Sequence, residues 1–271
     1  MRQVPDSWSD RVPKNISIQR QARCFHRHFH DGLVQAGFMC ASDLDDVEPR
    51  EEVPALLAFC RYYRIRNGFL QMVDCRLNQM DATTGKPDRN GRIGGEIMVQ
   101  QHALTDDIPM KHLPMFSYDS AWGQQGFVEF RYPGMAADFH PSFLSLYVDD
   151  FDMAMQLEAE LFFEQTLPKL DALAESEAHA AWWMTKIPAD GDVHALRFFQ
   201  ALWSQLTVRN WEAARRCAEK AAGSVAYPEW PQLAEIIARR DIREADDLLA
   251  ENRRNNLSML SERAPKLVPF L

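Results

Sequence analysis

Three histidines at alternate positions are the residues of this chain best suited to chemistry. On a strand, the segment FHRHFH at residues 25–30 would gather His26, His28 and His30 on one face, where imidazoles can bind a metal. On a helix, His26 and His30 share a flank about 40° apart, while His28 lies about 160° from His26. No glutamate of an H-E-x-x-H motif stands between them. We therefore expect structural or surface histidines and no metal, with His26 and His30 as the candidates if a metal or hydrolytic site exists.

A cysteine nucleophile is the second chemical possibility, because Cys24 precedes these histidines. At helical spacing Cys24 lies about 160° from His26 and about 40° from His28, and we take neither spacing as favourable for a nucleophile and its base. The five cysteines, Cys24, Cys40, Cys60, Cys75 and Cys217, form no C-x-x-C pair. An odd number without a framework is typical of reduced thiols in the cytosol.

Two acidic clusters are the other candidates for binding. Residues 41–54 carry six acids against Arg50, and residues 149–164 carry six acids and no base. Neither cluster fits a calcium-binding loop, and the acids at 149–150 can cap a helix. An acidic surface can instead steer a basic partner protein. The candidate partner-binding residues are Asp43, Asp45, Asp46, Glu48, Glu51, Glu52, Asp149, Asp150 and Asp152.

The net charge of −9 argues against nucleic acid as a partner, since phosphate contacts need a basic face. No run approaches the roughly 18 apolar residues that a membrane span needs, and the first residues lack the apolar stretch of a secretory signal. We expect a cytoplasmic protein without a cofactor.

The hydrophobic pattern predicts an α+β fold with an N-terminal helix, a mainly antiparallel sheet of about five strands and a C-terminal helical bundle. An apolar stripe predicts a helix over 16–36, ended by Gly37. Asn67-Gly68 predicts a hairpin between strands at 57–66 and 69–80. Further strands are predicted at 93–101, 126–132 and 142–148. We expect an α+β domain at 16–175 and a helical subdomain at 176–271.

The helical part begins with a predicted helix from about 150 to Leu167, where Pro168 kinks or stops it. Later helices are predicted at 176–187, 192–208, 210–222, 230–240 and 242–260. The segments at 210–220 and 241–251 resemble each other at a spacing of 31 residues, which we interpret as ordinary packing of helical hairpins. Tryptophans gather here, and we expect most of them in the core: Trp182, Trp183, Trp203, Trp211 and Trp230.

The order of elements over about residues 16–175 resembles uncharacterised bacterial α+β domains that include immunity proteins of polymorphic toxin systems. That resemblance implies a protein that works by occlusion and needs no catalytic residues. The leading hypothesis is therefore an immunity-type protein that neutralises a toxin through an acidic, aromatic-bearing surface. The alternatives are a metal-dependent or hydrolytic enzyme using the region of His26 and His30, and an adaptor whose helical hairpins bind a peptide.

Overall fold

The structure is a computed structural model, and its fold combines helices with an antiparallel sheet, as the sequence predicts. The chain divides into two compact units, which are residues 1–64, 71–100 and 126–169, and residues 65–70, 101–125 and 170–271. The expected boundary at residue 175 stays a prediction. The residues that the structure describes are 18–40, 61–77, 94–106, 144–145, 151–185, 195–221 and 230–270.

Among the residues that the structure describes, the sheet has four main strands, in the order β1 (Met39–Cys40), β2 (Arg61–Arg66), β3 (Phe69–Leu77) and β4 (Gly94–Ala103). The two-residue strand β5 (Leu144–Ser145) pairs antiparallel with the first residues of β4. The prediction of about five strands is therefore corrected. Of the strand predicted at 142–148, only residues 144–145 are among those that the structure describes, and the strand predicted at 126–132 lies outside them. Strand β1 was missed because two residues are too few to show an alternating pattern.

The predicted hairpin between β2 and β3 is present, and its turn has the expected backbone. Asn67 and Gly68 both have positive φ, 50° and 80°. This conformation matches the right-handed twist of the two strands, and Asn and Gly are the residues that adopt it most readily. The Asn67 side chain also donates a hydrogen bond of 2.7 Å to Glu175.

Helix α1 (Ile18–Gln35) buries the predicted apolar stripe, because Phe25, Phe29 and Leu33 are inaccessible to solvent. Gly37 ends the helix with φ 85°, and the next amide, that of Phe38, donates to the Leu33 carbonyl at 2.9 Å. This left-handed ending with its back-bonded amide is the helix stop that glycine favours. Strand β1 follows directly and pairs with β2.

The helix predicted from about 150 does not stop at Pro168. Helix α3 (Phe151–Leu161) continues through a π-helical turn, η5 (Phe162–Thr166), into α4 (Leu167–Ala172). In this turn the Leu167 amide donates to the Phe162 carbonyl, five residues back. Proline has no amide hydrogen, and its ring would collide with the carbonyl four residues earlier in a regular helix, so the chain widens here instead. Pro168 is thus a site of distortion within a continuing helix.

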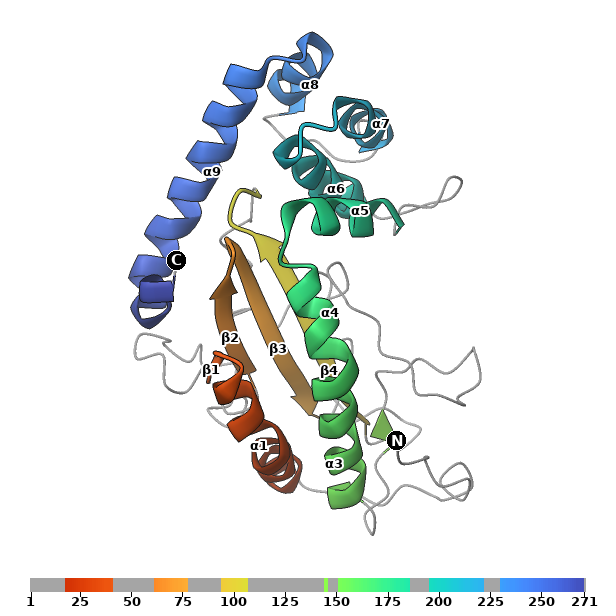
Figure 1. Ribbon diagram of the computed structural model, residues 1–271, viewed down its shortest axis with the longest axis vertical. Coiled ribbons are helices and arrows are strands. Elements are labelled where there is room, and N and C mark those ends of the chain that lie inside the picture. The colour runs from red at the N-terminus through yellow and green to blue at the C-terminus, as the bar shows by residue number, and fades with distance from the viewer. Residues whose placement is uncertain are drawn as a thin grey trace, which may run out of the picture. The chain divides into compact units, whose positions relative to one another are not determined.

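The π-helical turn packs against α1, and α1 and α3 lie side by side (Figure 1). The ring of Phe162 meets that of Phe29 edge-on at 5.6 Å between centroids, and Phe163 lies 5.9 Å from the same ring. Phe163 also covers Gly32, where an added Cβ atom would overlap the Cζ atom of its ring. The missing side chain of Gly32 therefore allows this close approach.

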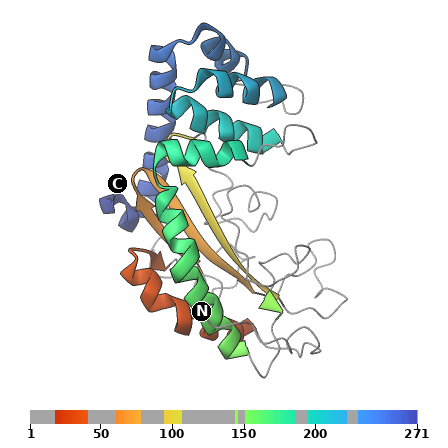
Figure 2. The ribbon, with the colours of Figure 1, turned by 45° about the vertical axis from the view of Figure 1, so that its right-hand side comes forward.

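The second unit contains the helices of the C-terminal half. These are α5 (Ser176–Thr185), α6 (Ala195–Thr207), α7 (Trp211–Ala221), α8 (Trp230–Arg239) and α9 (Ile242–Arg263), and their positions confirm the predicted helices. Helices α5 to α8 pack consecutively, each against the next (Figure 2). Their shared core includes Trp183, Leu202, Trp203, Leu206 and Ile237. A 3₁₀ turn, Pro265–Phe270, follows α9.

The turns before α7 and α9 are the same structure, 31 residues apart. Arg209 and Arg240 both have left-handed backbones, with φ 57° and 53°. In each turn the next residue, Asn210 or Asp241, donates its amide to the carbonyl five residues back and caps the following helix through its side chain. The sequence echo at this spacing therefore marks a repeated turn.

Beyond the repeated turn, α9 leaves the helical core. Leu249 still belongs to that core, but one turn later Asn252 donates to the Thr105 carbonyl at 3.1 Å. Asn256, which is buried, donates to the carbonyls of Leu104 and Asp106, both at 2.8 Å. Helix α9 thus supplies hydrogen bonds for the backbone that follows β4.

The contact of Gly32 with Phe163 predicts an unusual sign for Gly32→Ala. In an open helix position alanine is favoured over glycine by about 1 kcal/mol. Here the added Cβ would overlap the ring, so we expect a net loss of about 1–3 kcal/mol in the free energy of unfolding, measured with urea. The loss should shrink or reverse in a Phe163→Leu background, which removes the overlapping ring atoms. A stabilising Gly32→Ala in the wild-type background would contradict the packing described.

The repeated turn predicts that glycine is preferred at its left-handed position. Arg240→Gly should raise the free energy of unfolding by about 0.5–1 kcal/mol, because an L side chain is strained there. Arg216→Gly is the matched control, since Arg216 is exposed within α7. It should cost about 1 kcal/mol, as glycine does within a helix. Equal losses for both variants would rule out a strained backbone at Arg240.

Candidate functional site

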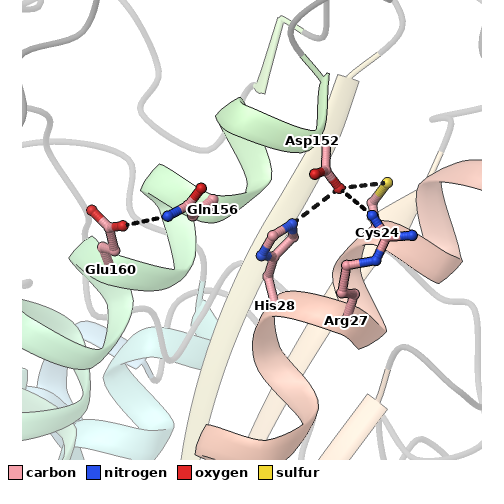
Figure 3. A network of polar contacts seen from close by, with 6 residues as sticks. All are labelled: Cys24, Arg27, His28, Asp152, Gln156 and Glu160. Atoms are coloured by element: carbon pink, nitrogen blue, oxygen red, sulfur yellow. Dashed lines mark hydrogen bonds and ion pairs between the residues drawn. The ribbon is translucent and has the colours of Figure 1, made fainter.

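The candidate site lies where the polar side of α1 meets the first turn of α3 in the first unit (Figure 3). One carboxylate oxygen, Oδ1 of Asp152, accepts from three side chains of α1. Its distances are 2.9 Å to Arg27 Nη1, 3.1 Å to His28 Nε2 and 3.5 Å to the Cys24 sulfur. One turn further along α3, Gln156 donates to Glu160 at 2.9 Å.

The electrostatics of this cluster favour the charged form of Asp152. The hydrogen bond from His28 is the main cause that lowers the pKa of Asp152, partial burial opposes it, and Cys24 and Arg27 add smaller lowering effects. Both ends of the ion pair are open to water, since the side chains of Arg27 and Asp152 are 63% and 54% exposed. Exposed pairs of this kind contribute about 0.2–1 kcal/mol. The cluster therefore contributes modestly to the stability of the contact between α1 and α3.

The arrangement of Cys24, His28 and Asp152 differs from that of a nucleophilic relay. In such a relay a histidine lies between the nucleophile and the carboxylate, so that it can take the proton of the nucleophile. Here Asp152 lies between the other two and accepts from the thiol directly. Our expectation that Cys24 and His28 are unfavourably spaced was wrong, because they are four residues apart, one helical turn, and reach the same atom. The geometry of Cys24, His28 and Asp152 is that of a packing contact between the two helices α1 and α3.

His26 and His30 lie on the other flank of α1, as the helical spacing predicts, with ring centroids 4.2 Å apart. Both Nδ1 atoms face the hydroxyl of Tyr62 on β2, at 3.2 Å and 2.9 Å. Tyr62 is fully buried and packs beside Phe25. A phenol can donate to one imidazole and accept from the other, which suits this pairing. Sequence reasoning missed Tyr62, since it lies on a strand far along the chain from the histidines.

Within the residues that the structure describes, no three side chains of His, Cys, Asp or Glu are arranged to hold a metal ion. The prediction that His26, His28 and His30 lie on a helix is confirmed. Cys24, Cys40 and Cys217 are buried thiols. Burial raises the pKa of Cys217 to about 11, against a smaller lowering by Arg216 and Lys220.

Asp152 is the one candidate partner-binding residue that falls within the described ranges. The other eight, Asp43, Asp45, Asp46, Glu48, Glu51, Glu52, Asp149 and Asp150, lie outside them. Asp152 is engaged by Arg27 and His28, so part of its charge is already neutralised. The role of all nine in binding stays a prediction.

The tryptophans of the helical part divide into buried and half-buried residues. Trp183 and Trp203 are buried in the core, whereas Trp182 and Trp211 pack against its edge. The side chain of Trp230 lies outside the described set. Of these, Trp182 and Trp211 retain some accessible surface.

Asp152→Asn tests the tie between α1 and α3. At pH 7 we expect a loss of less than about 1 kcal/mol in the free energy of unfolding, because the pair is exposed. The pKa of Asp152 is lowered in the folded state, so its contribution is present above the unfolded value near 3.8 and disappears as the pH falls through the lowered pKa. Wild type and variant should therefore converge at low pH. Glu164→Gln, an exposed change on the same continuous helix, should cost nothing measurable, and an equal loss there would contradict a specific tie.

Comparison of the chain with family models, with curated proteins and with solved structures finds no match. None of the helices that the structure describes is long and apolar enough to cross a membrane.

Proposed function

We propose that this is a bacterial, cytoplasmic binding protein of the immunity type, which neutralises a basic toxin domain by covering its active site. Its binding surface would consist of the acids at 41–54 and 149–152 with accessible aromatic side chains beside them. Acidic groups would speed the encounter with a basic partner, and desolvated aromatics would slow its release. This mode of action needs no chemistry from the chain.

The uneven distribution of charge is the observation that carries this proposal. Residues 195–271 contain 12 Lys and Arg against 10 Asp and Glu, so the whole acidic excess lies in residues 1–194. The first acidic segment begins one residue after β1, and the second leads into α3. Both segments are thus joined directly to elements of the packed first unit. A field of one sign on one part of a protein steers partners of the opposite sign.

The contacts of the described polar residues give less support to the two alternatives. For an enzyme, Asp152 occupies the central position that a catalytic histidine would need, and both Nδ1 atoms of His26 and His30 face Tyr62. For a peptide-binding adaptor, a helix should present an open face to the peptide. Residues 201–206 of α6 are instead all buried, including Ser204 and Gln205.

Charge reversal in the first acidic segment tests the proposal, with the partner obtained by co-purification from the native host. Stopped-flow association at low salt should slow by roughly tenfold or more, and the effect should shrink as ionic strength rises. Folding stability should change little, because residues 41–54 contain few apolar residues. The reversed residues are Asp43, Asp45, Asp46, Glu51 and Glu52.

The matched control reverses the same number of exposed acids in the C-terminal helices. These are Glu219, Glu235, Asp247, Glu251 and Glu262. The control variant has the same net charge as the test variant. It therefore separates the effect of where the acids lie from the effect of the total charge. Association at the wild-type rate in the test variant would refute steering by this segment. An equal slowing in both variants would show that only the net charge matters.

A further inference from the structure

A buried histidine holds helix α5 to the end of strand β4 in the second unit. His179 of α5 and Gln101 of β4 are 2% and 4% exposed. Gln101 Nε2 lies 2.6 Å from the Leu173 carbonyl and 2.9 Å from His179 Nδ1. On the other side of the ring, Trp183 Nε1 donates to His179 Nε2 at 3.0 Å. Phe69 of β3 packs on the imidazole at 4.9 Å between centroids.

Both nitrogens of His179 therefore face N–H donors. The Leu173 carbonyl is an acceptor, so the amide group of Gln101 must point its NH₂ toward that carbonyl and toward the ring. A neutral imidazole has one acceptor nitrogen, so one tautomer accepts from Trp183 and the other accepts from Gln101. An imidazolium has no acceptor nitrogen, so it would lose that hydrogen bond and place an N–H against an N–H donor on both sides of the ring. The surroundings of His179 thus accept the neutral ring and reject the charged one.

The electrostatic surroundings act in the same direction. Burial and, to a smaller extent, the positive charge of the neighbouring His102 lower the pKa of His179 to about 3. His102 of β4 is itself buried around Nε2, which has no hydrogen-bond partner in the described structure, and burial lowers its pKa to about 4. The carboxylate of Glu175, one turn before His179, is engaged by Asn67. No described acid compensates a positive charge on His179.

We propose that His179 is an acid-sensitive latch, which keeps α5 on β4 while neutral and releases α5 when it takes a proton. In the released form the imidazole is in water and has an ordinary proton affinity, near pH 6.5. The released form therefore binds a proton that the docked form excludes. Its population should rise about tenfold for each pH unit below about 6.5. Release exposes the Trp182-Trp183 pair of α5.

Amide hydrogen exchange in the full-length protein tests the latch. Protection factors of α5 peptides, corrected for the intrinsic pH dependence of exchange, should fall roughly 15-fold between pH 6.5 and pH 5.0. The α7 peptides are the control, because α7 (residues 211–221) contains no histidine and belongs to the same unit. Their protection should stay constant over this range. In His179→Gln, which cannot titrate, the protection of α5 should no longer depend on pH.

Three results would overturn the latch. The first is an unchanged pH dependence of α5 in His179→Gln, and the second is an equal fall for α7, which would mean global unfolding. The third comes from the wild-type protein by NMR of the histidine rings, and it decides the matter even if the variant fails to fold. The His179 signal should not titrate in the folded protein above pH 5, so a midpoint near 6.5 would rule out the latch.

Discussion

The close approach of α1 to the π-helical turn η5 positions the polar groups of the candidate site. Gly32 has no side chain, so the ring of Phe163 can lie on the helix backbone, and Phe29 and Phe162 fill the space beside it. This packing sets the distance between α1 and α3. At that distance Asp152 reaches Arg27, His28 and Cys24. The polar contacts are thus a consequence of aromatic packing one to three turns away.

The relative strengths of these interactions support the view that the aromatic packing positions the polar contacts. A buried phenylalanine stabilises a fold by several kcal/mol, as its truncation shows, whereas an exposed ion pair contributes about 1 kcal/mol or less. Asp152 therefore adds orientation to a helix pair that the aromatics already hold. The same reasoning applies to Tyr62, whose buried ring is fixed by packing against Phe25. Its hydroxyl then orders His26 and His30.

Much of this fold could be predicted because its elements follow local rules. The α1 stripe, the Gly37 stop and the Asn67-Gly68 turn each depend on residues close together in the sequence. The parts that could not be predicted depend on long-range or backbone effects. Nothing local indicates that Pro168 widens a helix instead of ending it, or that Tyr62 lies between two histidines. Arginine is also not a residue that marks a left-handed turn, so the echo at 31 residues gave no sign of its repeated backbone at Arg209 and Arg240.

Because packing holds this fold together and ion pairs add little stability, the acidic residues are available for another role, which is to act as a charged surface. Long-range steering depends on the number and sign of the charges and tolerates small errors in their position, unlike catalysis, which needs reacting groups held at fixed distances. Acids that serve steering alone need no partners within the fold. Asp152 does have partners, and the charge of Arg27 offsets its own, so it contributes less to the field than its exposure suggests. The acids at 41–54 have one arginine among them against six carboxylates, so under the proposed function they would attract a basic partner more strongly than Asp152 would.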